Sequence, residues 1–113
     1  MEVHRRLGPG LLERIYHECL FHELLKLELE VASEVSMDVT YDDLVLENAY
    51  RIDLLVENQV VVELKSVEEV SSLHRAQVLS YLKLGGFQLG LLINFNVPFL
   101  KNGVERIVNG LVE

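Results

Sequence analysis

Two short apolar segments, residues 50–56 and 60–65, constrain the fold of this chain more than any other feature of its sequence. They are separated by only three polar residues, Glu57, Asn58 and Gln59. Both segments are rich in β-branched residues and too short for a helix, and residues of this kind around a brief polar break are typical of a β-hairpin. Charged residues occur within both segments at alternating positions. The sequence therefore predicts an apolar hairpin that carries charges on one side.

The length of the connecting loop decides which side chains meet. If residues 57–59 form the loop, Val56 pairs with Val60 and Asp53 lies directly opposite Glu63, with Cβ atoms about 5 Å apart. A two-residue loop would move Glu63 to the other face. We expect the three-residue loop because only it lets the apolar faces of both strands coincide. One face then carries Ile52, Leu54, Val56, Val60, Val62 and Leu64, and the other carries Arg51, Asp53, Leu55, Val61, Glu63 and Lys65.

Opposed carboxylates at this position favour a metal site. Two such groups repel each other, and a cation between them relieves the repulsion. Mg²⁺ or Mn²⁺ suits hard oxygen ligands, and the backbone carbonyl of Leu64 could complete them. Lys65 faces the same way as Glu63 and could orient an attacking water, while Arg51 could screen the acids or contact a phosphate. The competing interpretation is a solvated strand face, on which a Glu-x-Lys pattern is common by chance.

The remaining segments predict a mixed α/β fold. Helical spacing of apolar residues runs over 11–27 and again over 70–84, and alternation over 31–41 predicts a strand. Extended segments are expected at 44–56, with an interruption near Glu47 and Asn48, at 60–66, and at 88–96, the last buried on both faces. Residues 104–108 fit a short strand or a helical turn. The order α-β-β-β-α-β predicts an antiparallel meander plus a parallel strand reached through the second helix, with a helix on each side of the sheet.

Composition limits the classes of function. The 113 residues fit a single domain, 1–113, and the net charge of −8 argues against a protein that holds nucleic acid by bulk electrostatic attraction. The one cysteine, Cys19, allows no disulfide and no cysteine-based zinc site within one chain, which favours a reducing, cytoplasmic location. No secretory signal or membrane span is expected. The four histidines show no metal-ligand spacing and are expected at the surface.

Several motifs occur in order along the chain. Residues 10–16 form Gly-x-x-Glu-x-x-Tyr, Asp53 is followed by Glu63-Leu64-Lys65, residues 77–81 form Gln-x-x-x-Tyr, and 90–95 form Gly-Leu-Leu-Ile-Asn-Phe. Together they resemble the GxxExxY family of the PD-(D/E)xK nuclease superfamily, over residues from about 4 to 109. This resemblance implies a restriction-endonuclease-like core. One departure is Ile52, which stands where the superfamily's first motif has proline.

The resemblance also implies roles for individual residues. Asp53 and Glu63 match the metal-binding acids, Lys65 the catalytic lysine, and Glu13 the first-helix glutamate that often completes such a site. Gln77 and Tyr81 match a motif of the RecB-like and Cas4-like branch that lies beside the active site and contacts DNA.

The leading hypothesis is therefore a Mg²⁺- or Mn²⁺-dependent nuclease that hydrolyses phosphodiester bonds of DNA, with RNA as the second choice. The alternative is an inactive binding or assembly module that kept the nuclease fold. A nuclease that needs a partner is a third option. A homodimer is also expected, because 113 residues offer a duplex little surface around one active site.

Overall fold

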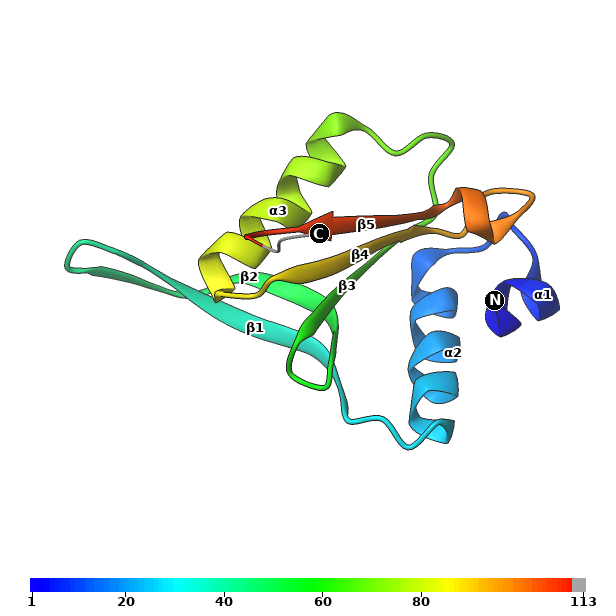
Figure 1. The fold of residues 1–113 in the computed structure, drawn as a ribbon, viewed down its shortest axis with the longest axis horizontal. Helices are drawn as coiled ribbons and strands as arrows, with labels where there is room; N and C mark the ends of the chain where they lie inside the picture. The colour runs from blue at the N-terminus through cyan, green and yellow to red at the C-terminus, as the bar shows by residue number, and fades with distance from the viewer. Residues whose placement is uncertain (111–113) are drawn as a thin grey trace.

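The structure, a computed structural model, describes residues 1–110 (Figure 1). The elements follow in the order α1 (Glu2–Leu7), α2 (Glu13–Lys26), β1 (Val31–Tyr41), β2 (Leu44–Val56), β3 (Val60–Lys65), α3 (Ser72–Gly85), β4 (Leu89–Asn94), η1 (Leu100–Asn102) and β5 (Val104–Val108). The predicted order is confirmed, with 104–108 forming a strand. The short helical segments α1 and η1 were not predicted, and both lie outside the strong apolar periodicity of the chain.

The five strands form one mixed sheet in the order β1-β2-β3-β4-β5. Strands β3 and β4 are parallel, and every other neighbouring pair is antiparallel. The parallel pair requires a crossover, which α3 provides, as the sequence predicts. The arrangement is that of a restriction-endonuclease-like α/β fold.

Helices α2 and α3 cover opposite faces of this sheet. Tyr16 of α2 packs with Leu54, Val62 and Leu64, whereas Leu82 of α3 packs with a separate cluster on the other face. Helix α3 begins at a capping box between Ser71 and His74 and ends before Gly86, which has φ 75°. Gly90 lets α3 approach β4, because a Cβ there would lie 3.0 Å from Val78 Cγ1.

The prediction that β4 is buried on both faces is wrong for one face. Gly90, Leu92 and Asn94 are buried beneath α3, but Leu91 and Ile93 on the α2 side are only half-buried. Helix α2 lies over β3, so the α2-side face at β4 is left partly open. Leu91 and Ile93 line an apolar hollow of about 250 Å³ there, together with Leu20, Leu24, Val56, Val60 and Val62.

The alternation of faces breaks at Asp53, where the expected grouping of Ile52 with Leu54 is wrong. Leu54 belongs to the cluster on the α2 side, but Ile52 belongs to the cluster that packs on α3. The opposing residue on β1, Glu34, has φ 54°, and the pairs Ser33↔Leu54 and Val35↔Ile52 on either side keep the same register. Val31 packs against the α2-side cluster and Val35 against the other one, so both strands exchange faces at the same level.

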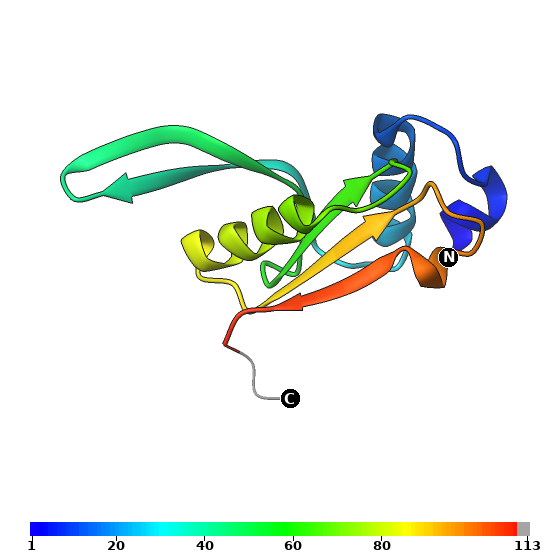
Figure 2. The ribbon, with the colours of Figure 1, turned by 90° about the horizontal axis from the view of Figure 1, so that it is seen from above.

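Beyond this point the β1–β2 hairpin projects away from the rest of the molecule (Figures 1 and 2). The predicted interruption near Glu47 and Asn48 is confirmed: Asn48 has φ 52°, and the β1–β2 register shifts between Met37 and Val39. No helix within residues 1–110 has the length and apolar character needed to cross a membrane.

Candidate active site

The β2–β3 hairpin has the predicted loop and register. Residues 57–59 form the turn, and Glu57 and Asn58 have φ of 52° and 54°. Val56 pairs with Val60, and the antiparallel ladder ends at Leu54↔Val62. The same register places Asp53 and Glu63 opposite each other, one step beyond the last backbone pair.

At that step, hydrogen bonds from backbone N–H groups to the two carboxyl groups take the place of backbone–backbone hydrogen bonds. The backbone N–H of Asp53 donates to Oε1 of Glu63 at 3.2 Å, and the N–H of Leu64 donates to Oδ2 of Asp53 at 2.9 Å. Each carboxyl group therefore bonds the opposite strand. These bonds satisfy backbone donors that the ending ladder would leave without partners, and they hold both acids at the point where the strands separate.

Glu63 is buried, with 4% of its surface exposed. Burial, and after it the neighbouring Asp53, raises the pKa of Glu63 to about 9, while the charge of Lys65 acts in the opposite direction. Without a cation, Glu63 therefore carries a proton at neutral pH. A bound cation would favour the ionised form of this carboxyl group and release the proton.

Lys65 lies at the end of β3, where it pairs with Asn94 of β4 and its carbonyl accepts a hydrogen bond from the N–H of Phe95 at 2.9 Å. Its side chain is half-buried. Its charge lowers the pKa of Glu63, so these two side chains lie near enough to interact. Their joint role with Asp53 as a site stays a prediction.

Glu13 begins α2 and is exposed. It borders a hollow of about 260 Å³ that also reaches Asp53 and Leu64 and is further lined by Arg14, His17, Glu18 and Glu34. Glu13 and Asp53 therefore share one cavity. Their relation as ligands stays a prediction, because no group of three or more His, Cys, Asp or Glu residues within 1–110 is arranged to hold a metal ion. In kind, the oxygen donors Asp53, Glu63 and the Leu64 carbonyl fit Mg²⁺, which retains several waters.

The tyrosine of the Gly-x-x-Glu-x-x-Tyr motif has a structural role. Tyr16 is fully buried and stacks on Phe95 with ring centroids 4.4 Å apart. Its hydroxyl donates to the carbonyl of Gly8 at 2.6 Å and accepts from the N–H of Leu11 at 3.1 Å. Tyr16 thus fixes the loop that precedes α2 and so sets the position of Glu13.

A second hydrogen bond joins this loop to the end of β3. The hydroxyl of Ser66 donates to the carbonyl of Leu11 at 2.6 Å. Ser66 follows Lys65 directly, so the start of α2 and the lysine of the candidate site are held to each other.

The substrate-binding residues predicted from sequence lie in three different settings. Tyr81 stacks on Tyr50 with ring centroids 4.5 Å apart, and burial followed by the carboxyl groups of Glu63 and Asp53 raises its pKa. Tyr81 therefore lies beside the acids. Gln77, one turn earlier on α3, is exposed. Arg51 is exposed and pairs with Glu34, at 3.8 Å, on the border of the cavity that reaches Asp53.

Two features near the site were not found from the sequence. His17 was expected at the surface, but it is buried, hydrogen-bonded to the Ser33 hydroxyl at 2.7 Å, and lines the cavity shared by Glu13 and Asp53. The four-residue spacing of Glu13 and His17, which places both on one helix face, could have indicated it. The second is Tyr50, whose buried hydroxyl has no hydrogen-bond partner within residues 1–110.

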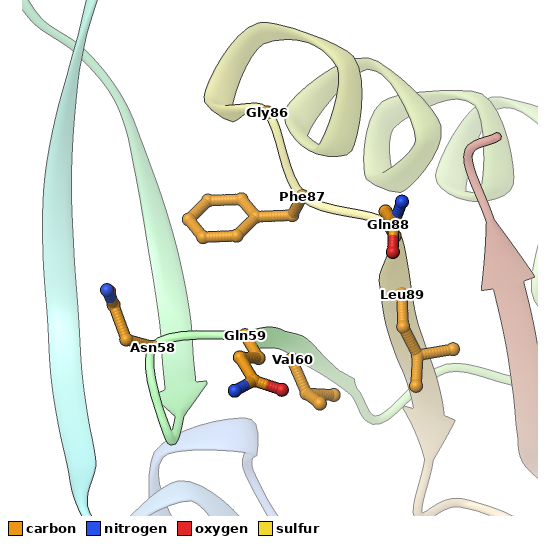
Figure 3. Close-up of a pocket in the computed structure, with 7 residues that line it drawn as sticks. All are labelled: Asn58, Gln59, Val60, Gly86, Phe87, Gln88 and Leu89. Carbon is orange, nitrogen blue, oxygen red and sulfur yellow. The ribbon is translucent and has the colours of Figure 1, made fainter. Parts of the chain in front are cut away.

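A larger hollow, of about 450 Å³, lies at the other end of β3. Figure 3 shows Phe87, from the connection after α3, extending toward the space beside Asn58 and Gln59 of the β2–β3 turn. Its lining side chains carry no charge, so this hollow offers neither the acids nor the lysine of the candidate site.

A sequence model of the PD-(D/E)XK nuclease superfamily matches residues 1–107. This chain belongs to that superfamily. The matched residues include Asp53 and the Glu63-Leu64-Lys65 segment. The GxxExxY family and the RecB-like and Cas4-like branch within the superfamily stay predictions.

The chain is also similar to a solved protein, in the crystal structure of SSO0001. The TM-score is 0.65 at 21% sequence identity, and the match covers 88% of this chain and 52% of that chain. The chain therefore spans about half the length of SSO0001, and at this identity the likeness supports the fold alone. No curated protein matches the sequence.

Proposed function

We propose that this PD-(D/E)XK chain is a divalent-metal-dependent nuclease that hydrolyses phosphodiester bonds in DNA, with Mg²⁺ or Mn²⁺ as its cofactor. The observation that carries the proposal is the pair of hydrogen bonds at the end of the β2–β3 ladder, in which the Glu63 carboxyl group accepts from the N–H of Asp53 and the Asp53 carboxyl group accepts from the N–H of Leu64, with the charge of Lys65 acting on Glu63. A buried acid with a raised pKa beside a second, half-buried acid and a lysine is typical of a catalytic site.

In this proposal Asp53, Glu63 and the Leu64 carbonyl hold the metal, and Glu13 acts from the cavity that it shares with Asp53. When bound, the cation would supply Lewis-acid stabilisation of the scissile phosphate and lower the pKa of a water. Lys65 orients the attacking water and stabilises charge that develops on the phosphate oxygens. Tyr81, Gln77 and Arg51 line the approach of the substrate.

Metal binding is the first test. Titration calorimetry with Mn²⁺ should show binding by the native chain that Asp53→Asn/Glu63→Gln loses. The control, Glu68→Gln/Glu69→Gln, removes two exposed acids elsewhere and should bind like the native chain. Binding that survives the loss of both site acids would contradict the assignment.

Cleavage is the second test. With Mg²⁺ and DNA or RNA substrates, Lys65→Ala should lower the rate about 100-fold or more. Lys83→Ala, which removes an exposed lysine on α3, should leave the rate unchanged. Circular dichroism melts would establish that both variants fold. Equal loss in both variants, or activity in Lys65→Ala, would count against the proposed role.

The second candidate function is a non-catalytic binding or assembly module on the same fold. The net charge of −8 supports it, because it opposes tight binding to nucleic acid. A well-folded native chain with neither Mn²⁺ binding nor cleavage would favour it. A homodimer, a cytoplasmic location and DNA rather than RNA as substrate are proposed with the nuclease and are tested separately from it.

A further inference from the structure

The projecting end of the β1–β2 hairpin, residues 38–48, is called the arm here. Tyr41 is 71% exposed and Leu44 is 56% exposed, and Val45 and Leu46 are exposed as well. Along a strand, Leu44 and Leu46 face one side and Val45 the other. Apolar side chains are therefore exposed on both faces of a thin hairpin, and clusters of this kind on a protein surface mark interaction sites.

The negative charge of the arm limits the kind of molecule that it can bind. Residues 38–48 contain Asp38, Asp42, Asp43 and Glu47, and no Lys or Arg. Four carboxylates would repel the phosphates of a nucleic acid. The arm therefore fits a protein surface that combines apolar side chains with positive charge.

The opposite end of the same molecule has such a surface. A hollow of about 340 Å³, called the α1 hollow here, lies between α1 and the residues around η1; it is lined by Met1, Glu2, His4, Arg5, Pro98, Phe99, Leu100 and Lys101. Phe99 is 67% exposed at its border. Its charged lining residues are Glu2, Arg5 and Lys101; Arg5 forms an ion pair with Glu2, so the net positive charge of the lining comes from Lys101. The hydrogen bond from the His4 ring to the Val97 carbonyl, at 2.7 Å, joins the two walls.

We propose that the arm of one copy of this chain docks into the α1 hollow of a second copy, and that the second copy returns the same contact. The arm and the α1 hollow lie at opposite ends of the longest axis of the molecule, 47 Å in extent (Figures 1 and 2). Two copies side by side in antiparallel orientation, related by a two-fold axis, bring each arm to the other copy's hollow. The interface closes because both contacts form at once.

Each contact joins complementary chemistry. Tyr41 and Leu44 at the arm tip supply the apolar anchors, and Phe99 and Pro98 supply apolar surface in the hollow. Asp43 and Lys101 supply opposite charges at the border. Aromatic and aliphatic anchors in a pocket with a charged rim are usual in protein interfaces. The proposal is independent of the nuclease function, because none of these residues lies in the candidate active site.

Complementary charge reversal tests the contact. Sedimentation equilibrium at low salt should show the native chain as a dimer. Asp43→Lys and Lys101→Glu should each weaken the dimer about tenfold or more, because like charges then meet in both contacts. An equal mixture of the two variants should restore dimers. In the mixed pair, one contact joins the reversed arm of the first variant to the reversed hollow of the second, and the other contact joins native residues.

Two further variants complete the experiment. Leu44→Ser removes an apolar anchor from the arm and should also weaken the dimer. Glu68→Lys reverses an exposed acid outside both surfaces and should leave association unchanged. Thermal melts by circular dichroism show which variants fold.

Each other outcome overturns the proposal. A native chain that stays monomeric up to its solubility limit has no such contact. Dimers that persist in the folded single variants would use another surface, and a mixture that does not restore dimers would show that the two charges do not meet. Open assemblies larger than dimers would contradict the two-fold closure.

Discussion

The two ends of strand β2 each carry three consecutive apolar residues, 44–46 and 54–56, but lie in opposite environments. Leu54, near the β3 end, is completely buried, whereas Leu44, at the arm, is 56% exposed. The difference lies in what covers each end. Helices α2 and α3 pack against the sheet at the first, and no element of residues 1–110 lies over the second (Figures 1 and 2). The same strand therefore serves as core at one end and as surface at the other.

Truncating one leucine at each end measures this contrast directly. Leu54→Ala should lower the free energy of unfolding by about 2–5 kcal/mol, because it leaves a cavity in the packed core. Leu44→Ala should change it by less than about 0.5 kcal/mol, as expected for a surface position. Urea unfolding at low protein concentration, where copies are apart, would give both values. Equal effects would show that the arm is as well packed as the centre.

Glu63, which lies on β3 beside the packed end of β2, and Glu47 in the arm should differ in their effect on the pH dependence of stability. The folded state keeps the proton of Glu63 up to about pH 9, whereas the unfolded chain releases it near 4.5. Between these values the unfolded state binds fewer protons, so stability of the metal-free protein falls as pH rises, by up to about 1.4 kcal/mol per pH unit. Glu63→Gln should remove this slope. Glu47→Gln, in the exposed arm, should leave it in place.

Urea unfolding across pH 5 to 8.5 would supply the slopes for this comparison. Stability of the native chain that is constant or rises over that range would contradict the raised pKa of Glu63.

The loss of a tyrosine hydroxyl should also change stability differently in the packed region and in the arm. Tyr16→Phe removes the hydroxyl that bonds Gly8 and Leu11, and should cost about 1 kcal/mol of stability. Tyr41→Phe, at the exposed arm tip, should cost nothing measurable. If the two changes were equal in thermal or urea unfolding, the hydroxyl of Tyr16 would not hold the loop before α2.

The smallest expected effect lies within the arm. Oδ1 of Asp38 accepts a hydrogen bond from the N–H of Asn48 at 2.8 Å. Asp38→Ala should lower stability by about 0.5 kcal/mol, because the bond is exposed to water. Asp43→Ala is the matched change without such a bond. Amide hydrogen exchange at Asn48 would report the loss, and unchanged protection would contradict the role of Asp38.

Local patterns predicted most of the strands and the central hairpin. The bounds of β1 and β2, 31–41 and 44–56, agree with the extended segments predicted from the sequence. The three-residue loop and the Val56↔Val60 pair followed from matching the two apolar faces. Since the register of a hairpin depends on nearby residues alone, the opposition of Asp53 and Glu63 could be predicted as well.

The environment of these acids could not be predicted in the same way. The break in alternation at Asp53 lies at the level of Glu34, a residue of a different strand with a left-handed backbone. The burial of His17 depends on Ser33 and on how α2 packs against the sheet. Both are consequences of contacts between segments that are distant in the sequence.

The sequence by itself determined where the hairpin turns and which acids oppose each other, because these properties follow from the two-residue period of a strand and the length of one loop. Only the tertiary structure decided that Glu63 is buried and its pKa raised, that Glu13 shares a cavity with Asp53, and that the arm is exposed at one end of an otherwise packed sheet. The physical reason is that burial depends on which other elements pack against a segment, and the sequence of a strand does not specify which helices will pack against it.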